Sequence, residues 1–167
     1  MTQRDDCRSS LDKGDREDHD TAEKQWDMHD ESGLRLHVAL VNPEIPPNTG
    51  NIARLCGATG CTLNLVRPLG FFLDDKRLKR AGLDYWELLT CKFFDSVEEL
   101  ERAYSGTGIY YVTTKGETCY TDVEYRRGDL LVFGPETAGL PQALLAAHPE
   151  RCIRIPMLPD RRARSLN

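Results

Sequence analysis

The stretch NPEIPPNTGNIARLC, residues 42–56, concentrates side chains that can bind a sugar or a phosphate group. Asn48, Thr49 and Asn51 offer compact hydrogen-bonding groups at the expected start of a helix, where free backbone N–H groups also point outward. The prolines ahead of them stiffen the chain and remove backbone donors. Arg54 follows within two helical turns and can reach the same region. The pattern indicates a site for ribose or phosphate oxygens, although Arg54 alone is equally typical of a solvated helix face.

A second polar segment, FGPETAGLP at residues 133–141, places Glu136 between two glycines. Glycine allows a ligand or another backbone to approach closely. Three roles for Glu136 are open. It could pair with Arg54, accept a hydrogen bond from a substrate hydroxyl, or cap the helix expected to begin near Pro141.

Short apolar runs alternate with helical patterns from residue 34 onward. We expect strands at 34–41, 62–66, 88–94, 108–114, 129–133 and 152–157, and helices at 48–59, 74–81, 97–104 and 141–148. This alternation predicts an α/β domain with a mainly parallel sheet flanked by helices. We expect Asn48 or Thr49 to cap the first helix, Gly60 to end it, and Ser96 with Glu99 to form a capping box.

A third polar segment, IPMLPDRRARSLN at residues 155–167, ends in Ser165 and Asn167. Like the other two, it follows an expected strand. In α/β sheets, ligands bind at the carboxyl ends of the strands, where such loops meet. The three segments together therefore indicate one functional site.

The net charge of −5 is unevenly spread along the chain. Residues 1–33 hold 11 acidic and 5 basic side chains, a net of −6, which leaves residues 34–167 with 16 acidic and 17 basic ones, a net of +1. The first segment has few apolar residues and cannot offset the entropy of ordering. We therefore predict a disordered acidic tail at 1–33 and one domain at 34–167. A solubilising role is favoured over that of an acidic decoy.

Several classes of protein are disfavoured. The chain has no apolar run of membrane-spanning length and no signal peptide, so we expect a soluble cytoplasmic protein. The six cysteines form no C-x-x-C pair and the four histidines are scattered, which argues against a metal site. The cysteines are better interpreted as small buried apolar residues in a reducing compartment. Walker A and G-x-S-x-G motifs are absent, and GTGIYY precedes a strand instead of following one.

Five segments, in order along the chain, resemble the SPOUT superfamily of knotted RNA methyltransferases: NPEIPPNTGNIARLC, DDKRLKRAGLDYWE, TTKG, FGPETAGLP and IPM…RSLN. They are most similar to the family that methylates the ribose 2′-hydroxyl of cytidine or uridine at the tRNA wobble position. The resemblance covers nearly all of 34–167. It implies an α/β knot, a homodimer, S-adenosylmethionine (SAM) as the cofactor without a metal, and the tRNA anticodon loop as the partner.

The resemblance also implies roles for single residues. Carried over by position, the cofactor contacts are Val112, Gly134, Ile155 and Ser165, and the active-site residues are Asn48, Arg54, Glu136, Ser165 and Asn167. The implied reaction is an in-line attack of the ribose hydroxyl on the SAM methyl group. Arg54 is either the base that takes the proton or the anchor of the adjacent phosphate.

RNA binding requires positive charge and, for splayed bases, aromatic surfaces. The stretches DDKRLKR at 74–80 and RRARS at 161–165 supply basic side chains, and Tyr85 with Trp86 could stack a base. A solvated charged face and core aromatics are the competing interpretations.

Relatives in this family continue beyond the position of Asn167 into a helix that completes the knot. We therefore expect an incomplete knot and weakened cofactor binding in this chain. The alternatives are a catalytically inactive RNA-binding module of the same fold, a methyltransferase for another tRNA or rRNA position, and an unrelated nucleotide-binding α/β domain.

Overall fold

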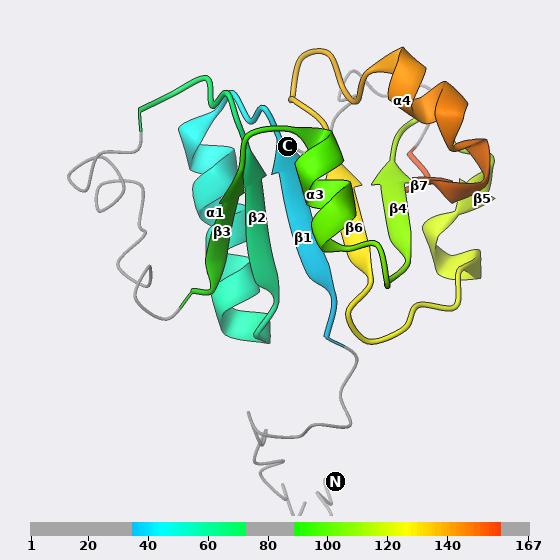
Figure 1. Ribbon diagram of the computed structural model, residues 1–167, viewed down its shortest axis with the longest axis horizontal. Coiled ribbons are helices and arrows are strands. Elements are labelled where there is room, and N and C mark those ends of the chain that lie inside the picture. Colours follow the sequence, from blue (N-terminus) through cyan, green and yellow to red (C-terminus); the bar gives the residue numbers. More distant parts are fainter. Residues whose placement is uncertain (1–34, 73–88, 158–167) are drawn as a thin grey trace, which may run out of the picture. The chain divides into compact units, whose positions relative to one another are not determined.

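The computed structural model describes residues 35–72 and 89–157. These residues belong to one compact unit, Glu31–Asn167, whose seven strands form a single sheet in the order β3-β2-β1-β6-β4-β7-β5 (Figure 1). The strands are β1 (His37–Val41), β2 (Thr62–Val66), β3 (Cys91–Phe94), β4 (Ile109–Val112), β5 (Thr118–Cys119), β6 (Leu130–Phe133) and β7 (Cys152–Arg154). Every pairing in the sheet is parallel, which confirms the predicted fold class.

Helix α1 (Pro46–Thr59) begins earlier than the sequence suggested. Its N-cap is Ile45, whose side chain makes no capping hydrogen bond, so the prediction that Asn48 or Thr49 caps the helix is wrong. Pro46 and Pro47 occupy the first turn because proline has a suitable φ and lacks only an N–H that the helix cannot use there. Gly60 ends the helix in the left-handed conformation, φ 71°, as predicted.

The other helices of the described residues are short. They are α3 (Val97–Ala103), α4 (Gln142–Ala147) and the 3-10 turns η2 (Tyr120–Asp122) and η3 (Pro149–Arg151). The Ser96 hydroxyl accepts a hydrogen bond from the Glu99 amide at 3.2 Å, which confirms the predicted cap of α3. The Glu99 carboxylate binds the backbone N–H of Asp95 at 2.7 Å, one residue ahead of the usual capping-box partner. The helix expected at 74–81 lies outside the described residues.

Alternate residues of the strands face two separate cores. Ala39 and Val41 of β1 join the core beneath α3 and α4, while Leu40 packs with Ala53 and Cys56 of α1. Figure 1 shows α1 and α3 on opposite faces of the sheet. Fully burying one valine or leucine side chain stabilises the fold by about 1.5–3 kcal/mol, so both apolar faces of the sheet must be covered by helices.

One buried polar residue joins a strand to a helix. Asn64 of β2 is fully buried, yet its amide donates to the Val38 carbonyl at 3.0 Å and accepts from the Tyr104 hydroxyl at 2.9 Å. Satisfied buried polar groups of this kind fix the relative positions of the elements that carry them.

The strand order brings four loops to one edge of the sheet. Strands β1, β6, β4 and β7 are consecutive neighbours and point the same way, so their carboxyl ends lie together. The loops at 42–45, 134–141, 113–117 and 155–157 follow these strands. This is the edge at which parallel α/β sheets bind ligands.

Candidate functional site

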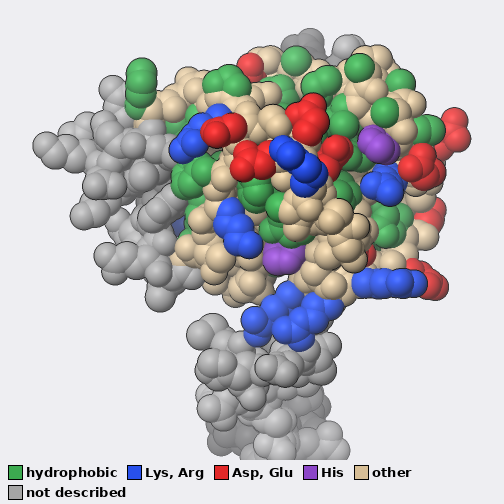
Figure 2. All heavy atoms as spheres, in the orientation of Figure 1, with side chains coloured by type: hydrophobic (Ala, Val, Ile, Leu, Met, Phe, Trp, Pro, Cys, Tyr) green, Lys and Arg blue, Asp and Glu red, His purple; other side chains and the backbone are tan. Residues whose placement is uncertain are grey.

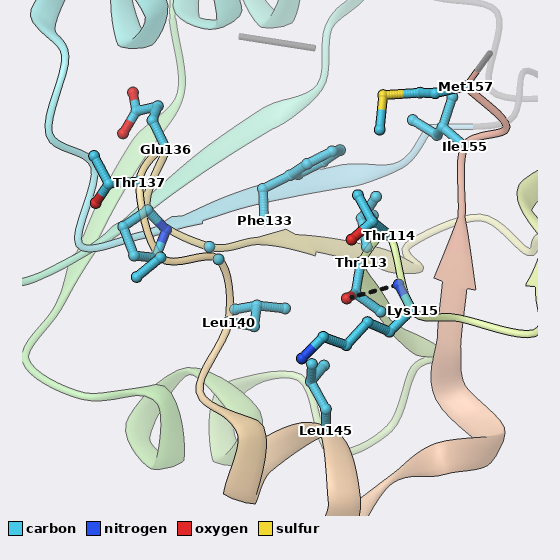
Figure 3. A pocket seen from close by; sticks show the side chains of 15 residues that line it. Thr113, Thr114, Lys115, Phe133, Glu136, Thr137, Leu140, Leu145, Ile155 and Met157 are labelled. Atoms are coloured by element: carbon cyan, nitrogen blue, oxygen red, sulfur yellow. Dashed lines mark hydrogen bonds between the residues drawn. The ribbon is translucent and has the colours of Figure 1, made fainter. Parts of the chain in front are cut away.

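A pocket of about 290 Å³ opens at this edge (Figure 3). Its walls come from the ends of β4 and β6, the loop at 134–141, α4 and the segment after β7. The apolar side chains lining it include Val112, Phe133, Leu140, Leu145, Ile155 and Met157. In Figure 3, Ile155 and Met157 lie on one side, Glu136 and Thr137 lie on the other, and Phe133 lies between them.

The pocket brings together three residues that the sequence singled out. Val112 ends β4, Gly134 follows β6 and Ile155 follows β7, and all three line the same cavity. A Cβ added to Gly134 would lie 2.2 Å from the Leu140 backbone nitrogen, so only glycine lets the 134–141 loop fold back on itself. Gly139, at φ +68°, supplies the left-handed turn in the same loop. Both glycines therefore shape the wall of the pocket.

Glu136 is bound to the start of α1. Its Oε2 accepts a hydrogen bond from the Glu44 backbone N–H at 2.8 Å, and its Oε1 accepts from the Ile45 N–H at 3.3 Å and the Asn48 amide at 3.2 Å. One of these donors, the N–H of the N-cap residue Ile45, is a group that a helix start leaves without an intrahelical partner. None of the three roles considered for Glu136 describes this contact. The helix that it serves is α1, not α4.

Glu44, in the loop at 42–45, binds the 134–141 loop through its own carboxylate. Its carboxylate accepts from the Thr137 backbone N–H at 3.1 Å, and the Thr137 hydroxyl lies 2.7 Å and 3.0 Å from its two oxygens. Sequence analysis missed both residues, because nothing in either segment shows that the two loops meet. The only available signal was that both loops follow strands of the same parallel sheet.

The contact with Glu136 determines how the Asn48 side chain is oriented. A carboxylate only accepts hydrogen bonds, so the Asn48 NH₂ group must face Glu136. The Asn48 carbonyl oxygen is then directed elsewhere and can accept a hydrogen bond from another molecule. Thr49, by contrast, is 2 % exposed, so its side chain faces the protein interior and does not extend the polar surface.

Arg54 lies on the exposed side of α1, one turn beyond the exposed Asn51. Six residues of α-helix correspond to a rise of about 9 Å and a rotation of about 240°, so Asn48 and Arg54 leave the helix in different directions. The structure thus places Arg54 on the same helix as Asn48.

Lys115, in the TTKG segment, also lines the pocket. Its ammonium group donates to the Gln142 side chain at 2.8 Å, which connects the loop after β4 to the first residue of α4. Gln142 was not singled out from the sequence, because a glutamine at a helix start has no distinctive pattern.

The cysteines of the described residues are free thiols. Burial raises the pKa of Cys56 and of Cys91 to about 12, so both remain protonated and unreactive at neutral pH. Across 35–72 and 89–157, no group of three or more His, Cys, Asp or Glu side chains could hold a metal ion. In the same residues, no helix is long and apolar enough to cross a membrane.

Several predicted residues lie outside the described residues: Ser165, Asn167, the basic stretches at 74–80 and 161–165, and Tyr85 with Trp86. On the visible face, acidic and basic side chains are interspersed around α3, where Arg67 pairs with Asp95 at 2.9 Å (Figure 2). A mixed surface of this kind attracts phosphate groups only weakly.

Known proteins are similar to this chain in sequence and in fold. The tRNA (cytidine(34)-2'-O)-methyltransferase of Escherichia coli is 48% identical over 133 residues, which cover 79% of this chain and 85% of that one. A structure solved for the 2-OH methylation of C/U34 on tRNA is 43% identical, with a TM-score of 0.72, and the match covers 80% of this chain and 86% of that chain.

A more distant structure holds a cofactor. The SpoU methyltransferase AviRb from Streptomyces viridochromogenes, in complex with AdoMet, is 28% identical with a TM-score of 0.63, over 80% of this chain and 52% of that one. Residues 35–167 match the model of the SpoU rRNA methylase family. With that match and a relative at 48% identity, the chain belongs to the SpoU rRNA methylase family.

Proposed function

We propose that this protein transfers a methyl group from SAM to the ribose 2′-hydroxyl of the wobble nucleotide, cytidine or uridine, of tRNA. Family membership and the names of the relatives in the preceding subsection support this reaction. The structural observation that carries it is the hydrogen bonding of Glu136. This residue lines the pocket and also holds the start of α1, where Asn48 lies. The pocket and the polar segment therefore form one site.

The residues of the pocket fit the proposed cofactor. The lining combines apolar side chains with threonines, which suits a nucleoside joined to a sulfonium-bearing chain. The volume of about 290 Å³ is close to the lower end of the range for small-molecule sites, roughly 300 Å³. Val112, Gly134 and Ile155 would hold the cofactor, and Ser165 joins them by resemblance. When bound, SAM supplies the electrophilic methyl group.

Asn48 is proposed to orient the ribose. Glu136 holds its NH₂ group, so its carbonyl oxygen can accept a hydrogen bond from a ribose hydroxyl. Holding the hydroxyl in an attacking geometry is worth up to about 7–11 kcal/mol in the best intramolecular cases. Asn167 is assigned to the same site by resemblance alone.

Arg54 is proposed as the anchor of the phosphate next to that ribose. A protonated guanidinium has no site that accepts a proton, whereas its planar fork suits phosphate oxygens. The competing role is that of the base. Arg54→Ala with unchanged tRNA affinity and abolished transfer would contradict the pure anchor role.

The reaction can be tested with methyl-labelled SAM and tRNA transcripts that carry C34 or U34. We expect label in both, and none in matched transcripts with a 2′-deoxy nucleotide at position 34. Label that persists in the deoxy transcripts would move the target to another nucleotide. Binding of S-adenosylhomocysteine (SAH) without any transfer to tRNA or ribosomal RNA would favour an inactive RNA-binding module.

The family resemblance further implies a homodimer. The sequence pattern adds the proposals that the protein acts in the cytoplasm and that the acidic residues 1–33 form a tail, with 34–167 as the methyltransferase domain. Light scattering at several protein concentrations would measure the mass in solution. A monomer at all concentrations would exclude the dimer.

A further inference from the structure

The loops at 42–45 and 134–141 exchange hydrogen bonds through two glutamates. The Glu44 carboxylate binds the N–H and the hydroxyl of Thr137, and the Glu136 carboxylate binds the N–H groups of Glu44 and Ile45 and the amide of Asn48. We call these contacts the glutamate exchange. Each loop thus holds the other with charge-assisted hydrogen bonds, which are about twice as strong as neutral ones.

The exchange has a feature that loop packing alone does not require. It places an acidic side chain in each of the two contacting loops, although carboxylates repel each other. Among the described residues, the donors to these two carboxylates are backbone N–H groups, an amide and a hydroxyl, whose directions are fixed by the loops and by the start of α1. The geometry of both carboxylates therefore depends on the conformation of both loops.

The two loops serve different parts of the proposed site. Thr137 and Glu136 line the pocket. Glu44 instead lies just before α1, the helix that contains Asn48. Glu136 has a direct contact with Asn48, whereas the Glu44 carboxylate binds Thr137 and the Glu44 backbone N–H binds Glu136. Glu44 is thus a connector between the two loops.

We propose that Glu44 is a positioning residue that couples occupancy of the pocket to binding of the RNA. This rests on the proposed function. A ligand that orders the 134–141 loop also orders Glu136 and Thr137, and through the glutamate exchange it orders the start of α1 and Asn48. Binding of the cofactor product SAH then raises tRNA affinity, and by thermodynamic reciprocity tRNA raises SAH affinity by the same factor.

The test measures tRNA affinity with and without saturating SAH. The ratio of the two dissociation constants is the coupling, and allosteric couplings of this kind are typically about 5–150-fold. We expect at least about 5-fold for the wild type. For Glu44→Ala the ratio should fall to about 1 because the connection between the loops is lost. Thr137→Val removes only the hydroxyl and should lower the ratio partly.

Two further variants separate positioning from general stability. Glu44→Gln keeps the length of the side chain and one acceptor oxygen, so it should retain part of the coupling. Glu124→Ala removes an exposed glutamate from the segment before β6 and should leave the ratio unchanged. Thermal unfolding and SAH titration of each variant establish that it folds and that its pocket binds.

The outcomes decide between the proposals. A wild-type ratio near 1, or a Glu44→Ala ratio equal to that of the wild type, overturns this inference even if methyl transfer to tRNA occurs. Equal weakening of both affinities in Glu44→Ala, with the ratio preserved, also overturns it, because that is the result of simple destabilisation. A coupling lost in Glu44→Ala without any methyl transfer by the wild type keeps the inference and overturns the proposed function. Absence of tRNA binding overturns both.

Discussion

Asn48 shows how a single hydrogen bond sets the chemistry that a side chain presents. An amide offers a donor and an acceptor of nearly equal size, and the sequence does not reveal which one faces a ligand. The acceptor-only carboxylate of Glu136, 3.2 Å away, takes the NH₂ group and leaves the carbonyl oxygen for the substrate. The residue is therefore proposed to act as an acceptor.

Replacing Asn48 tests this directly. Asn48→Ala removes both hydrogen bonds, and a hydrogen bond to a charged group is worth about 1.5–3 kcal/mol. We expect kcat/KM for tRNA to fall roughly 10–100-fold, while SAH affinity changes little because Asn48 does not line the pocket. Asn48→Asp should be at least as impaired, since it places a second carboxylate beside Glu136. Labelled methyl transfer and calorimetry measure the two quantities, and equal losses in both would contradict the assignment.

At the same scale, His37 makes the stability of the fold depend on pH. Burial, together with the nearby Lys92, lowers the pKa of His37 from its ordinary value of 6.5, and its ring lies 5.1 Å from that of Tyr104. The folded state therefore favours neutral His37. Below pH 6.5 the unfolded state binds more protons at this position, so stability falls as the pH drops from 6.5 towards the lower folded-state pKa.

The variant His37→Phe keeps an aromatic ring beside Tyr104 but cannot titrate. We expect urea unfolding of the wild type to show a larger loss of stability between about pH 7.5 and about pH 5.5 than the variant shows. Above pH 6.5 the difference between the two proteins should be independent of pH. Parallel losses over the whole range would show that other groups cause the pH dependence.

At the scale of elements, the 134–141 loop depends on its own tight path. Gly134→Ala would place a methyl group 2.2 Å from the Leu140 nitrogen, so the loop must open. The sheet and the core beneath α1 lie outside this loop and should still form, whereas the core beneath α3 and α4 receives Leu140 from it. The pocket wall and Glu136 are displaced together, so both the cofactor pocket and the proposed ribose site at Asn48 should bind more weakly.

The expected result for Gly134→Ala is a loss of SAH affinity of about tenfold or more, equivalent to about 1.4 kcal/mol. Gly106→Ala is the matched control, because a Cβ there meets no atom within 4 Å. Calorimetry should find wild-type affinity for that control. Unchanged affinity in a folded Gly134→Ala protein would show that the pocket does not hold the cofactor.

At the scale of the whole molecule, charge is divided between two parts of the chain. Residues 1–33 carry a net of −6 and the remainder a net of +1. An acidic segment tethered to an RNA-binding domain competes electrostatically with RNA phosphates, and salt screens that competition over a Debye length of about 10 Å at 0.1 M.

Changing the six aspartates within residues 5–20 to asparagine brings the net charge of residues 1–33 to zero. We expect tRNA binding to tighten a few-fold at low salt and the gain to vanish at about 0.5 M salt. SAH affinity, which does not involve RNA phosphates, is the control. A gain that persists at high salt would indicate a specific contact instead of a charge effect.

Local patterns in the sequence were sufficient for the α/β class and for most element positions. The apolar runs became β1, β2 and β6, and the Ser96 cap and the Gly60 exit were confirmed, because these features depend on neighbouring residues alone. The two-residue strand β5 was missed because so short a segment has no period. The cap of α1 was predicted wrongly because the helix starts with Pro46 and Pro47, ahead of Asn48.

The sequence by itself determined which residues carry polar chemistry and that they follow parallel strands. Only the tertiary structure decided their partners. Glu136 could have paired with Arg54, a ligand or α4, and the order β1-β6-β4-β7 placed its loop against the start of α1. The same order made Glu44 and Thr137 neighbours, 93 residues apart. Contacts of that kind depend on which strands lie side by side, and strand order is set by the packing of the whole sheet.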